Sequence, residues 1–286
     1  MTIVGCGLIG ASFALAVRRS GACGRIAGWD SSDAVLREAL GRGIIDEVDQ
    51  SATTGRPSES DLLYLAMPVG EIINFLREKG WRIKHGALVT DAGSTKTEVC
   101  RAARLHLPKE VRFIGGHPIT GSHHSGPTNA RAELFAGAPY VLIEEDGQET
   151  SRELKALTAT LELVGARVTT MTAAEHDQAL ALLSHLPQLL SSALVATIEQ
   201  GTNAGALLAG PGYRDMTRLA GSAWSMWGDI LATNSLPIAH ALNQMIERLT
   251  VVRDELVGKA KCPTLALPIS RGLFERSFQT TVVSQG

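Results

Sequence analysis

The stretch Ile3-Val4-Gly5-Cys6-Gly7-Leu8-Ile9-Gly10-Ala11 decides the fold of this chain. Its glycines have the spacing G-x-G-x-x-G, after a short apolar run and before the helical pattern of residues 11–19. A second apolar run, residues 26–29, leads into Asp30, twenty residues after Gly10. Such glycines let the backbone approach a pyrophosphate at a helix N-terminus, and the acidic residue accepts hydrogen bonds from ribose hydroxyls. The stretch therefore predicts a dinucleotide-binding turn rather than an ordinary glycine-rich loop.

The surroundings of Asp30 indicate which dinucleotide is bound. No Lys or Arg follows Asp30 before Arg37, so a 2′-phosphate has no evident partner. The sequence predicts NAD rather than NADP as the cofactor. The loop residues expected to bind it are Gly5, Gly7, Leu8, Ile9 and Gly10, together with Asp30.

Apolar runs and helical patterns alternate through the first 170 or so residues. Strands are predicted at 3–4, 26–29, 62–66, 87–90, 113–114, 140–143 and 167–171, and helices at 11–19, 34–41, 69–79 and 154–164. This alternation is typical of a parallel, doubly wound sheet. We predict a Rossmann-like α/β domain over residues 1–171 and an all-α domain over residues 172–286.

Composition narrows the class of protein. The chain has 286 residues, 44% of them hydrophobic, so it can bury a core and is not disordered. Its 27 Lys and Arg face 29 Asp and Glu, which gives no basic field for nucleic acid. The four cysteines are far apart, as expected for thiols in a reducing compartment. No apolar stretch reaches eighteen residues without charge or proline, so we expect a cytoplasmic protein without a membrane span.

The segment from Val168 to Tyr213 contains no Lys or Arg. A surface helix normally carries basic residues, so the segment should be buried, within a helical bundle or against a second subunit. Polar residues form one stripe on its long helix, at Asp177, Ala181, Ser184, His185, Gln188 and Ser192. Because the stripe lacks Lys, Arg and Glu, we interpret it as the lining of a cavity. Pro187 is expected to kink the helix.

Two further strand ends carry polar residues. Asp91 to Lys96 lies where a strand meets a helix, and Thr95 with Glu98 has capping-box spacing. A helix cap and a strand end facing the cofactor both remain open there. Gly115-Gly116-His117-Pro118 follows the next strand, and His117 can act as a general base near neutral pH. His117 and His123 do not have a common metal-ligand spacing, so no metal site is predicted.

These motifs together resemble the prephenate/arogenate dehydrogenases of tyrosine biosynthesis. The resemblance covers roughly residues 1–250. It rests on motifs that occur in the same order, at Gly7–Gly10, Ala66–Val69, Asp91–Ser94, Gly115–Ser122, His176-Asp177, Ser184–Pro187 and Arg214–Arg218.

The resemblance implies a reaction and roles for individual residues. The reaction is NAD-dependent oxidative decarboxylation of a cyclohexadienol. In it His117 accepts the proton of the C4 hydroxyl, and Ser94 hydrogen-bonds that hydroxyl and His117. Arg218 binds a substrate carboxylate through a buried guanidinium. The remaining substrate residues are His185, Gln188, His123 and Ser122, and Met67, Pro68 and Ser94 join the cofactor residues. The helical domain of this family forms a homodimer.

Two departures from the family pattern concern the substrate. Many members have a second histidine where this chain has Gln188, and an acidic residue where it has His123. Because the lining offers histidines, Gln188 and Arg218, with Asp177 the only nearby acid, the charges favour the dianion prephenate over the ammonium-bearing arogenate. A dual-specificity enzyme and a 4-amino-4-deoxyprephenate dehydrogenase remain open. So do a β-hydroxyacid dehydrogenase, whose usual lysine base is missing, and an NAD-sensing binding protein without turnover.

Overall fold

The computed structural model describes residues 1–51, 59–121, 125–144, 151–201, 208–261 and 270–277. Its contacts divide the chain into two compact units, residues 1–235 and 236–286. The predicted domain boundary near Met171 stays a prediction. The second unit contains most of α12 (Ser235–Lys261) and a helical segment at 270–277. All the candidate site residues that the structure describes belong to the first unit.

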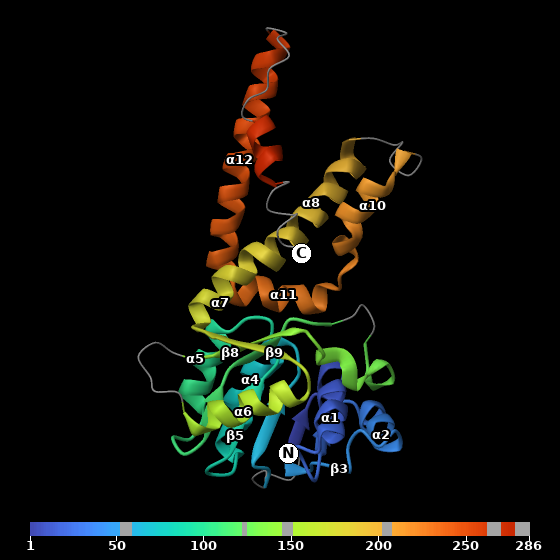
Figure 1. The fold of residues 1–286 in the computed structure, drawn as a ribbon, viewed down its shortest axis with the longest axis vertical. Helices are drawn as coiled ribbons and strands as arrows, with labels where there is room; N and C mark the ends of the chain where they lie inside the picture. Colours follow the sequence, from blue (N-terminus) through green and yellow to red (C-terminus); the bar gives the residue numbers. More distant parts are fainter. Residues whose placement is uncertain (52–58, 122–124, 145–150, 202–207, 262–269, 278–286) are drawn as a thin grey trace. The chain divides into compact units, whose positions relative to one another are not determined.

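A six-stranded parallel sheet organises the first unit (Figure 1). Its order is β3-β2-β1-β4-β5-β6. The strands are β1 (Thr2–Val4), β2 (Ala27–Trp29), β3 (Glu47–Val48), β4 (Leu62–Leu65), β5 (Leu88–Asp91) and β6 (Arg112–Ile114). From β1 the chain first adds strands on one side, up to β3, and then on the other side, beginning with β4. Sheets of this kind bind dinucleotides where the strand order changes direction, here between β1 and β4. The predicted doubly wound α/β fold is confirmed.

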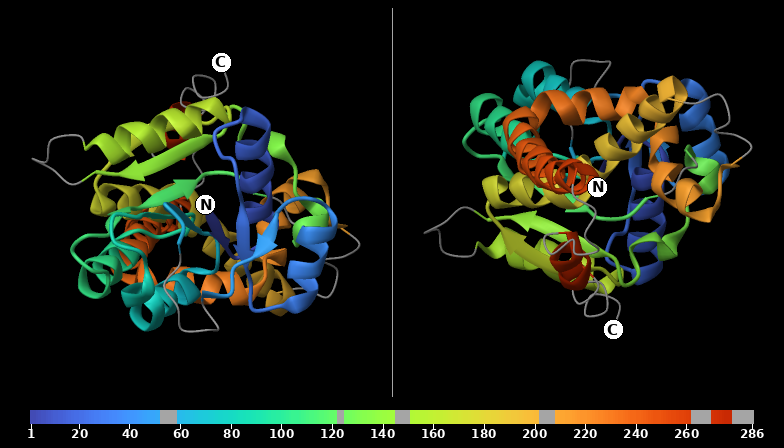
Figure 2. Two further views of the ribbon diagram at one scale, coloured as in Figure 1. Left: turned by 90° about the horizontal axis from the view of Figure 1, so that it is seen from below. Right: turned by 90° about the horizontal axis from the view of Figure 1, so that it is seen from above.

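Helices cover both faces of this sheet. They are α1 (Leu8–Ser20), α2 (Asp33–Gly41), α4 (Val69–Lys79), α5 (Thr97–His106) and α6 (Arg152–Leu163). One buried cluster joins α1, α2 and α6 to the sheet, and a second joins α4 and α5 to it. Figure 2 (left) shows the blue α1 and yellow-green α6 apart from the teal α4 and α5.

The later strands form a second sheet, which the alternation did not indicate. Its order is β7 (Gly116–Pro118), β8 (Pro139–Ile143) and β9 (Arg167–Met171). Only Gly115 separates β6 from β7, too few residues for the crossover that parallel neighbours need. The chain instead turns into β7, which pairs with β8 antiparallel. The two sheets meet at a buried hydrogen bond between the hydroxyls of Tyr64 and Tyr140, 3.1 Å long.

The helices after β9 begin with α7 (Ala173–Leu180), capped by a Thr172–Glu175 capping box. A π-helical turn over Ala181–His185 leads into α8 (Leu186–Gly201). Pro187 lacks the N–H that an α-helix would require, and the π turn just before it absorbs the mismatch. Then follow α10 (Pro211–Thr217), a 3₁₀ turn over Arg218–Gly221 and α11 (Trp224–Thr233). The predicted all-α character of this half is confirmed.

Candidate active site

The glycine loop leaves room for a phosphate group. Gly5 has φ +93°, and a Cβ on Gly10 would lie 2.1 Å from the carbonyl oxygen of Gly5, so both positions require glycine. A Cβ on Gly7, in contrast, would meet nothing within 4 Å. Gly7 is the N-cap of α1 and no side chain caps that helix. The first N–H groups of α1 and the open space over Gly7 therefore fit a dinucleotide pyrophosphate.

Asp30 lies beside this loop at the end of β2. Its two carboxylate oxygens accept the backbone N–H groups of Cys6 and Ser32, each at 2.9 Å. Each oxygen retains a lone pair, so the carboxylate can also accept the two hydroxyls of a ribose. Met67, after β4, packs against the loop, because its Cγ would lie 2.8 Å from a Cβ on Gly5. These residues fit NAD.

A buried ion pair holds the end of β5 against the start of β7. The Asp91 carboxylate pairs with the Lys96 ammonium, and both side chains are fully buried. Asp91 also accepts the Gly116 N–H at 3.0 Å, while Lys96 donates to the Gly116 carbonyl at 2.8 Å. A Cβ on Gly116 would lie 2.6 Å from the Asp91 carbonyl oxygen. The pair and the glycine together fix the backbone that carries His117.

His117 is the first member of a buried hydrogen-bonded chain. Its Nδ1 lies 2.8 Å from Nε2 of His176, and Nδ1 of His176 lies 2.8 Å from the Asp177 carboxylate. The three residues are 8%, 0% and 2% exposed, respectively. His117 comes from β7, whereas His176 and Asp177 come from α7.

Asp177 also forms the N-terminal cap of α5. Its two oxygens accept the N–H groups of Lys96 and Thr97, both at 2.8 Å. Burial raises the pKa of Asp177, but the hydrogen bonds from His176, Thr97 and Lys96 outweigh it, and the net pKa lies below the ordinary value. The carboxylate is therefore ionised and has no free role toward a ligand.

Of the two interpretations left open for this segment, the capping box of Thr95 and Glu98 does not form. Lys96 is the N-cap of α5, and no side chain of that segment caps it. The hydroxyl of Thr95 instead contacts that of Thr233 in α11, at 2.8 Å. Asp177, which lies on α7, accepts the N–H groups at the start of α5. These groups therefore need no cap from Thr95 or Glu98.

The hydrogen bonds assign the tautomer of each ring. An ionised carboxylate only accepts, so His176 carries a proton on Nδ1. A His176 ring that carries only this proton accepts at Nε2, so His117 then carries its proton on Nδ1 and its lone pair on Nε2. Burial, followed by the charges at His176, Lys96 and His185, lowers the pKa of His117 well below its ordinary value. His117 is thus a neutral base at physiological pH.

A second buried histidine, His185, lies on the π turn. Asn234 donates to its Nδ1 at 3.1 Å and to the backbone oxygen of Asp177 at 2.8 Å. The carbonyl oxygen of Asp177 can only accept, which assigns the amide nitrogen of Asn234 to this side and leaves His185 protonated on Nε2. Burial lowers the pKa of His185 to about 4. The ring packs edge-on against Trp227, and it can donate one hydrogen bond from Nε2.

Gln188 and Arg218 occupy positions that differ from the sequence expectation. The Gln188 amide donates to the Leu219 carbonyl at 2.8 Å and accepts from the Ser222 hydroxyl at 3.1 Å. Gln188 therefore attaches the 3₁₀ turn, which contains Arg218, to α8. Arg218 itself is exposed, so the expected burial of its guanidinium is wrong: the short 3₁₀ turn lies at the surface of the chain. Within the described residues Arg218 has no ion-pair partner.

The remaining predicted residues are only partly placed. Ser94 is half-buried, and no hydrogen bond joins it to His117 in the described part of the chain. Pro68 is exposed after β4. Ser122 and His123 lie outside the described residues. Among the described residues no group of three or more His, Cys, Asp or Glu is arranged to hold a metal ion.

Sequence reasoning gave no role in this cluster to four residues that complete it. The His176-Asp177 pair was noticed only as a motif, and neither Asn234 nor Lys96 was singled out. Their side chains are 0–2% exposed and hydrogen-bonded, although Oδ1 of Asn234 has no partner among the described residues. A signal existed for Asp177, which lies on the charge-poor polar stripe. No pattern in the sequence marks Asn234, whose partners are 49 and 57 residues away.

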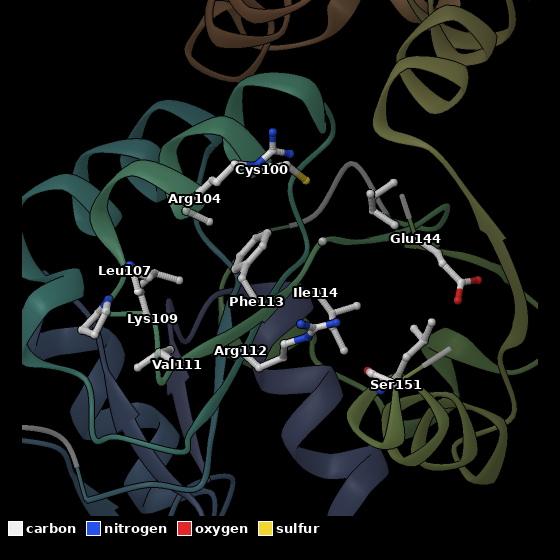
Figure 3. A pocket seen from close by; sticks show the side chains of 15 residues that line it. Cys100, Arg104, Leu107, Lys109, Val111, Arg112, Phe113, Ile114, Glu144 and Ser151 are labelled. Carbon is white, nitrogen blue, oxygen red and sulfur yellow. Dashed lines mark hydrogen bonds between the residues drawn. The ribbon is translucent and has the colours of Figure 1, made fainter. Parts of the chain in front are cut away.

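A cavity in the described part of the chain lies apart from these residues. It has a volume of about 570 Å³ and is bordered by Cys100 and Arg104 of α5, Phe113 of β6, Glu144 and Ser151 (Figure 3). None of the predicted site residues lines it. The cavity is therefore not part of the His117 cluster.

Comparison with known proteins identifies the family. Residues 13–170 match the nucleotide-binding domain of prephenate dehydrogenase, and residues 172–266 match its dimerization domain. A prephenate dehydrogenase of Bacillus subtilis is 36% identical over 256 residues, covering 88% of this chain and 68% of that protein. The chain belongs to the prephenate dehydrogenase family. It spans about two thirds of the length of the Bacillus relative.

Solved structures of the family superpose closely. Prephenate dehydrogenase from Aquifex aeolicus, in complex with hydroxyphenyl propionate and NAD⁺, has a TM-score of 0.87 and 29% identity, covering 99% of this chain and 97% of that one. Synechocystis arogenate dehydrogenase has a TM-score of 0.80 and 28% identity, covering 99% of both chains. A relative named for prephenate and a relative named for arogenate thus share this fold.

The dimerization domain explains the charge-poor segment. Asp177, Ala181, His185 and Gln188 of the predicted polar stripe are buried, whereas Leu182 and Leu183 are 49% and 78% exposed. The continuous helical segment Ala173–Gly201 is long and apolar enough to cross a membrane by length and composition, and only 28% of its apolar window is buried. Burial within the chain's own bundle is therefore wrong for most of this helix. The apolar face suits the subunit contact that this family's domain makes.

Proposed function

We propose that this protein is an NAD-dependent prephenate dehydrogenase that converts prephenate to 4-hydroxyphenylpyruvate and carbon dioxide. The observation that carries the proposal is His117, a buried neutral histidine with its lone pair on Nε2, fixed beside the carboxyl ends of the parallel strands. The family membership supplies the reaction type.

The residues would act in two steps. His117 Nε2 takes the proton of the C4 hydroxyl as the C4–H bond breaks and a C4 carbonyl forms. Bound NAD supplies the acceptor for the hydride that leaves C4. Loss of the ring carboxylate as carbon dioxide then returns an electron pair through the ring to the C4 oxygen, which takes its proton back from His117. The ring is aromatic at the end of this step.

His185 and Arg218 would bind the substrate. His185 is neutral with its proton on Nε2, so it donates a hydrogen bond without taking part in proton removal. Arg218 has no ion-pair partner among the described residues and suits a carboxylate. Ser94, at the cofactor side of β5, would hydrogen-bond the substrate hydroxyl. Ser122 and His123 are proposed to complete the lining.

The charges in the cluster support prephenate over arogenate. Arogenate carries an ammonium group, for which a pocket would offer an acid. Asp177 has its oxygens committed to His176, Lys96 and Thr97. Gln188 is buried and holds the Arg218 turn through both ends of its amide, so the amide is poorly placed to bind the ammonium. Arogenate oxidation remains the second candidate because a structural relative bears that name.

The test compares NADH production from prephenate and arogenate at one pH and salt concentration. We expect the higher kcat/KM with prephenate, with 4-hydroxyphenylpyruvate as the product. A higher value with arogenate would reverse the substrate assignment. The exposed Leu182 and Leu183 of the π turn, with the mostly unburied apolar segment Ala173–Gly201, support a homodimer. The wide spacing of the four cysteines suits the reducing cytoplasm.

A further inference from the structure

The proposed reaction leaves a proton on a residue that is poorly placed to hold it. His117 is 8% exposed, and among the described residues no carboxylate forms a hydrogen bond or ion pair with it. The charged and titratable groups around it are His176 of α7, Lys96 before α5 and His185 of the π turn, and burial is the largest cause that lowers the pKa of His117. The Asp91 carboxylate pairs with Lys96 rather than with His117. An imidazolium at His117 is therefore unfavourable.

The next ring in the chain is better placed. His176 lies 2.8 Å from His117 on one side and 2.8 Å from the Asp177 carboxylate on the other. Two backbone N–H groups hold Asp177 in place, and Asn234 holds its carbonyl. A positive charge on His176 would contact an ionised carboxylate directly.

We propose that His176 is a positioning residue that holds the displaced proton, in a His117–His176–Asp177 relay. The proposal rests on the function proposed above. As the substrate O–H bond breaks, an N–H bond forms at Nε2 of His117. The Nδ1–H bond of His117 breaks and an N–H bond forms at Nε2 of His176. His117 stays neutral, in its other tautomer, and the positive charge lies between His117 and Asp177, on His176.

The relay differs from simple orientation in what His176 must be able to do. For orientation it needs only to accept a hydrogen bond from Nδ1 of His117. In the relay it must also take the proton. His176→Gln separates the two roles, because the side-chain oxygen of Gln reaches about as far as Nε2 of His, accepts a hydrogen bond and binds no proton at neutral pH. His106, an exposed histidine at the end of α5, gives the matched control His106→Gln.

The experiment measures kcat, kcat/KM against pH, NAD⁺ affinity and thermal stability for the full-length protein and these variants. We expect His176→Gln to lower kcat by roughly 10²-fold, with NAD⁺ affinity retained and His106→Gln unchanged. The acid limb of kcat/KM should also move to lower pH, by about one unit or more. In the wild type a proton added at Nε2 of His176 would lie between His117 and the Asp177 carboxylate, and would force His117 to carry its own proton on Nε2, which removes the base. In the variant only His117 remains, and its pKa is depressed.

The outcomes separate the relay from the proposed function. If the wild type turns over substrate and His176→Gln has the same kcat and the same acid limb of kcat/KM, the relay is overturned but the proposed function is not. A lowered kcat with an unmoved acid limb also overturns it, since orientation accounts for that result. No turnover of either substrate by the wild type overturns the function and the relay together.

A second measurement does not depend on the folding of the variant. Nitrogen-15 spectra of histidine-labelled wild type, at neutral pH, report which ring nitrogen carries the proton. We expect His117 and His176 both to be protonated on Nδ1, and His185 on Nε2. A His117 ring protonated on Nε2 contradicts the relay whatever the variants do.

Discussion

The glycine loop and the His117 cluster are built in opposite ways. The loop is one continuous stretch, Gly5 to Gly10, that offers backbone N–H groups and open space over Gly7. The cluster draws side chains from β7, α7, the start of α5 and the residue after α11, joined by buried hydrogen bonds. A site made of local backbone can be found in a sequence. A site made of distant side chains depends on the whole fold.

The largest effect should come from the cluster. His117→Asn should lower kcat by roughly 10²–10⁴-fold, because the general base is lost. The Asn amide can still donate to Nε2 of His176 from about the position of Nδ1, so the fold and NAD⁺ affinity should be retained. Steady-state kinetics and NAD⁺ titration test both parts. An Asn variant with most of its activity would show that the proton goes elsewhere.

The loop offers a matched pair of glycine substitutions. Gly10→Ala would bring a Cβ within 2.1 Å of the Gly5 carbonyl, and we expect it to destabilise the fold by about 3 kcal/mol. Gly7→Ala has free space and should leave the melting temperature nearly unchanged. Its methyl group would instead occupy the phosphate space and weaken NAD⁺ binding at least about tenfold. Equal stability of the two variants would contradict the packing argument for Gly10.

The two regions also differed in how well the sequence predicted them. The parallel doubly wound sheet, the glycine loop and the helix at 69–79 followed from local pattern. The His117–His176 contact could not be predicted, because no pattern links residues 59 positions apart. The inward face of the long helix was predicted from its missing charges. The hydrogen bonds from the Gln188 amide to the turn that carries Arg218 were not predicted, because they depend on how that turn packs against α8.

Substitution of the exposed Arg218 tests whether this residue binds the substrate on which the buried cluster acts. Arg218→Ala should raise KM roughly 10- to 100-fold and change kcat much less, because a charge-assisted hydrogen bond to the substrate carboxylate is lost. The residue has no ion pair among the described residues, so stability should hold. Steady-state kinetics and a thermal melt decide the matter. A variant that unfolds would make Arg218 a structural residue.

The buried histidines also make the cluster sensitive to acid. The pKa of His185 falls from 6.5 to about 4 on folding, so the unfolded chain binds its proton first as pH falls. The stability contributed by neutral His185 is complete above pH 6.5 and is lost progressively toward pH 4. Between pH 7 and pH 5 this histidine alone should lower the free energy of unfolding by about 2 kcal/mol. Denaturant titrations at both pH values measure the change, and His185→Asn should reduce it.

The smallest effect concerns the choice of cofactor, and it returns to the loop. The Asp30 carboxylate is fixed by two backbone N–H groups, so it cannot turn away from the ribose without losing both bonds. It accepts from the 2′-hydroxyl of NAD and repels the 2′-phosphate of NADP. We expect kcat/KM to favour NAD at least about tenfold, equivalent to about 1.4 kcal/mol. Asp30→Asn removes the repulsion while keeping an acceptor, and should narrow the preference without changing kcat with NAD much. If the wild type uses both cofactors equally, the loop selects for a dinucleotide but Asp30 does not select between the two.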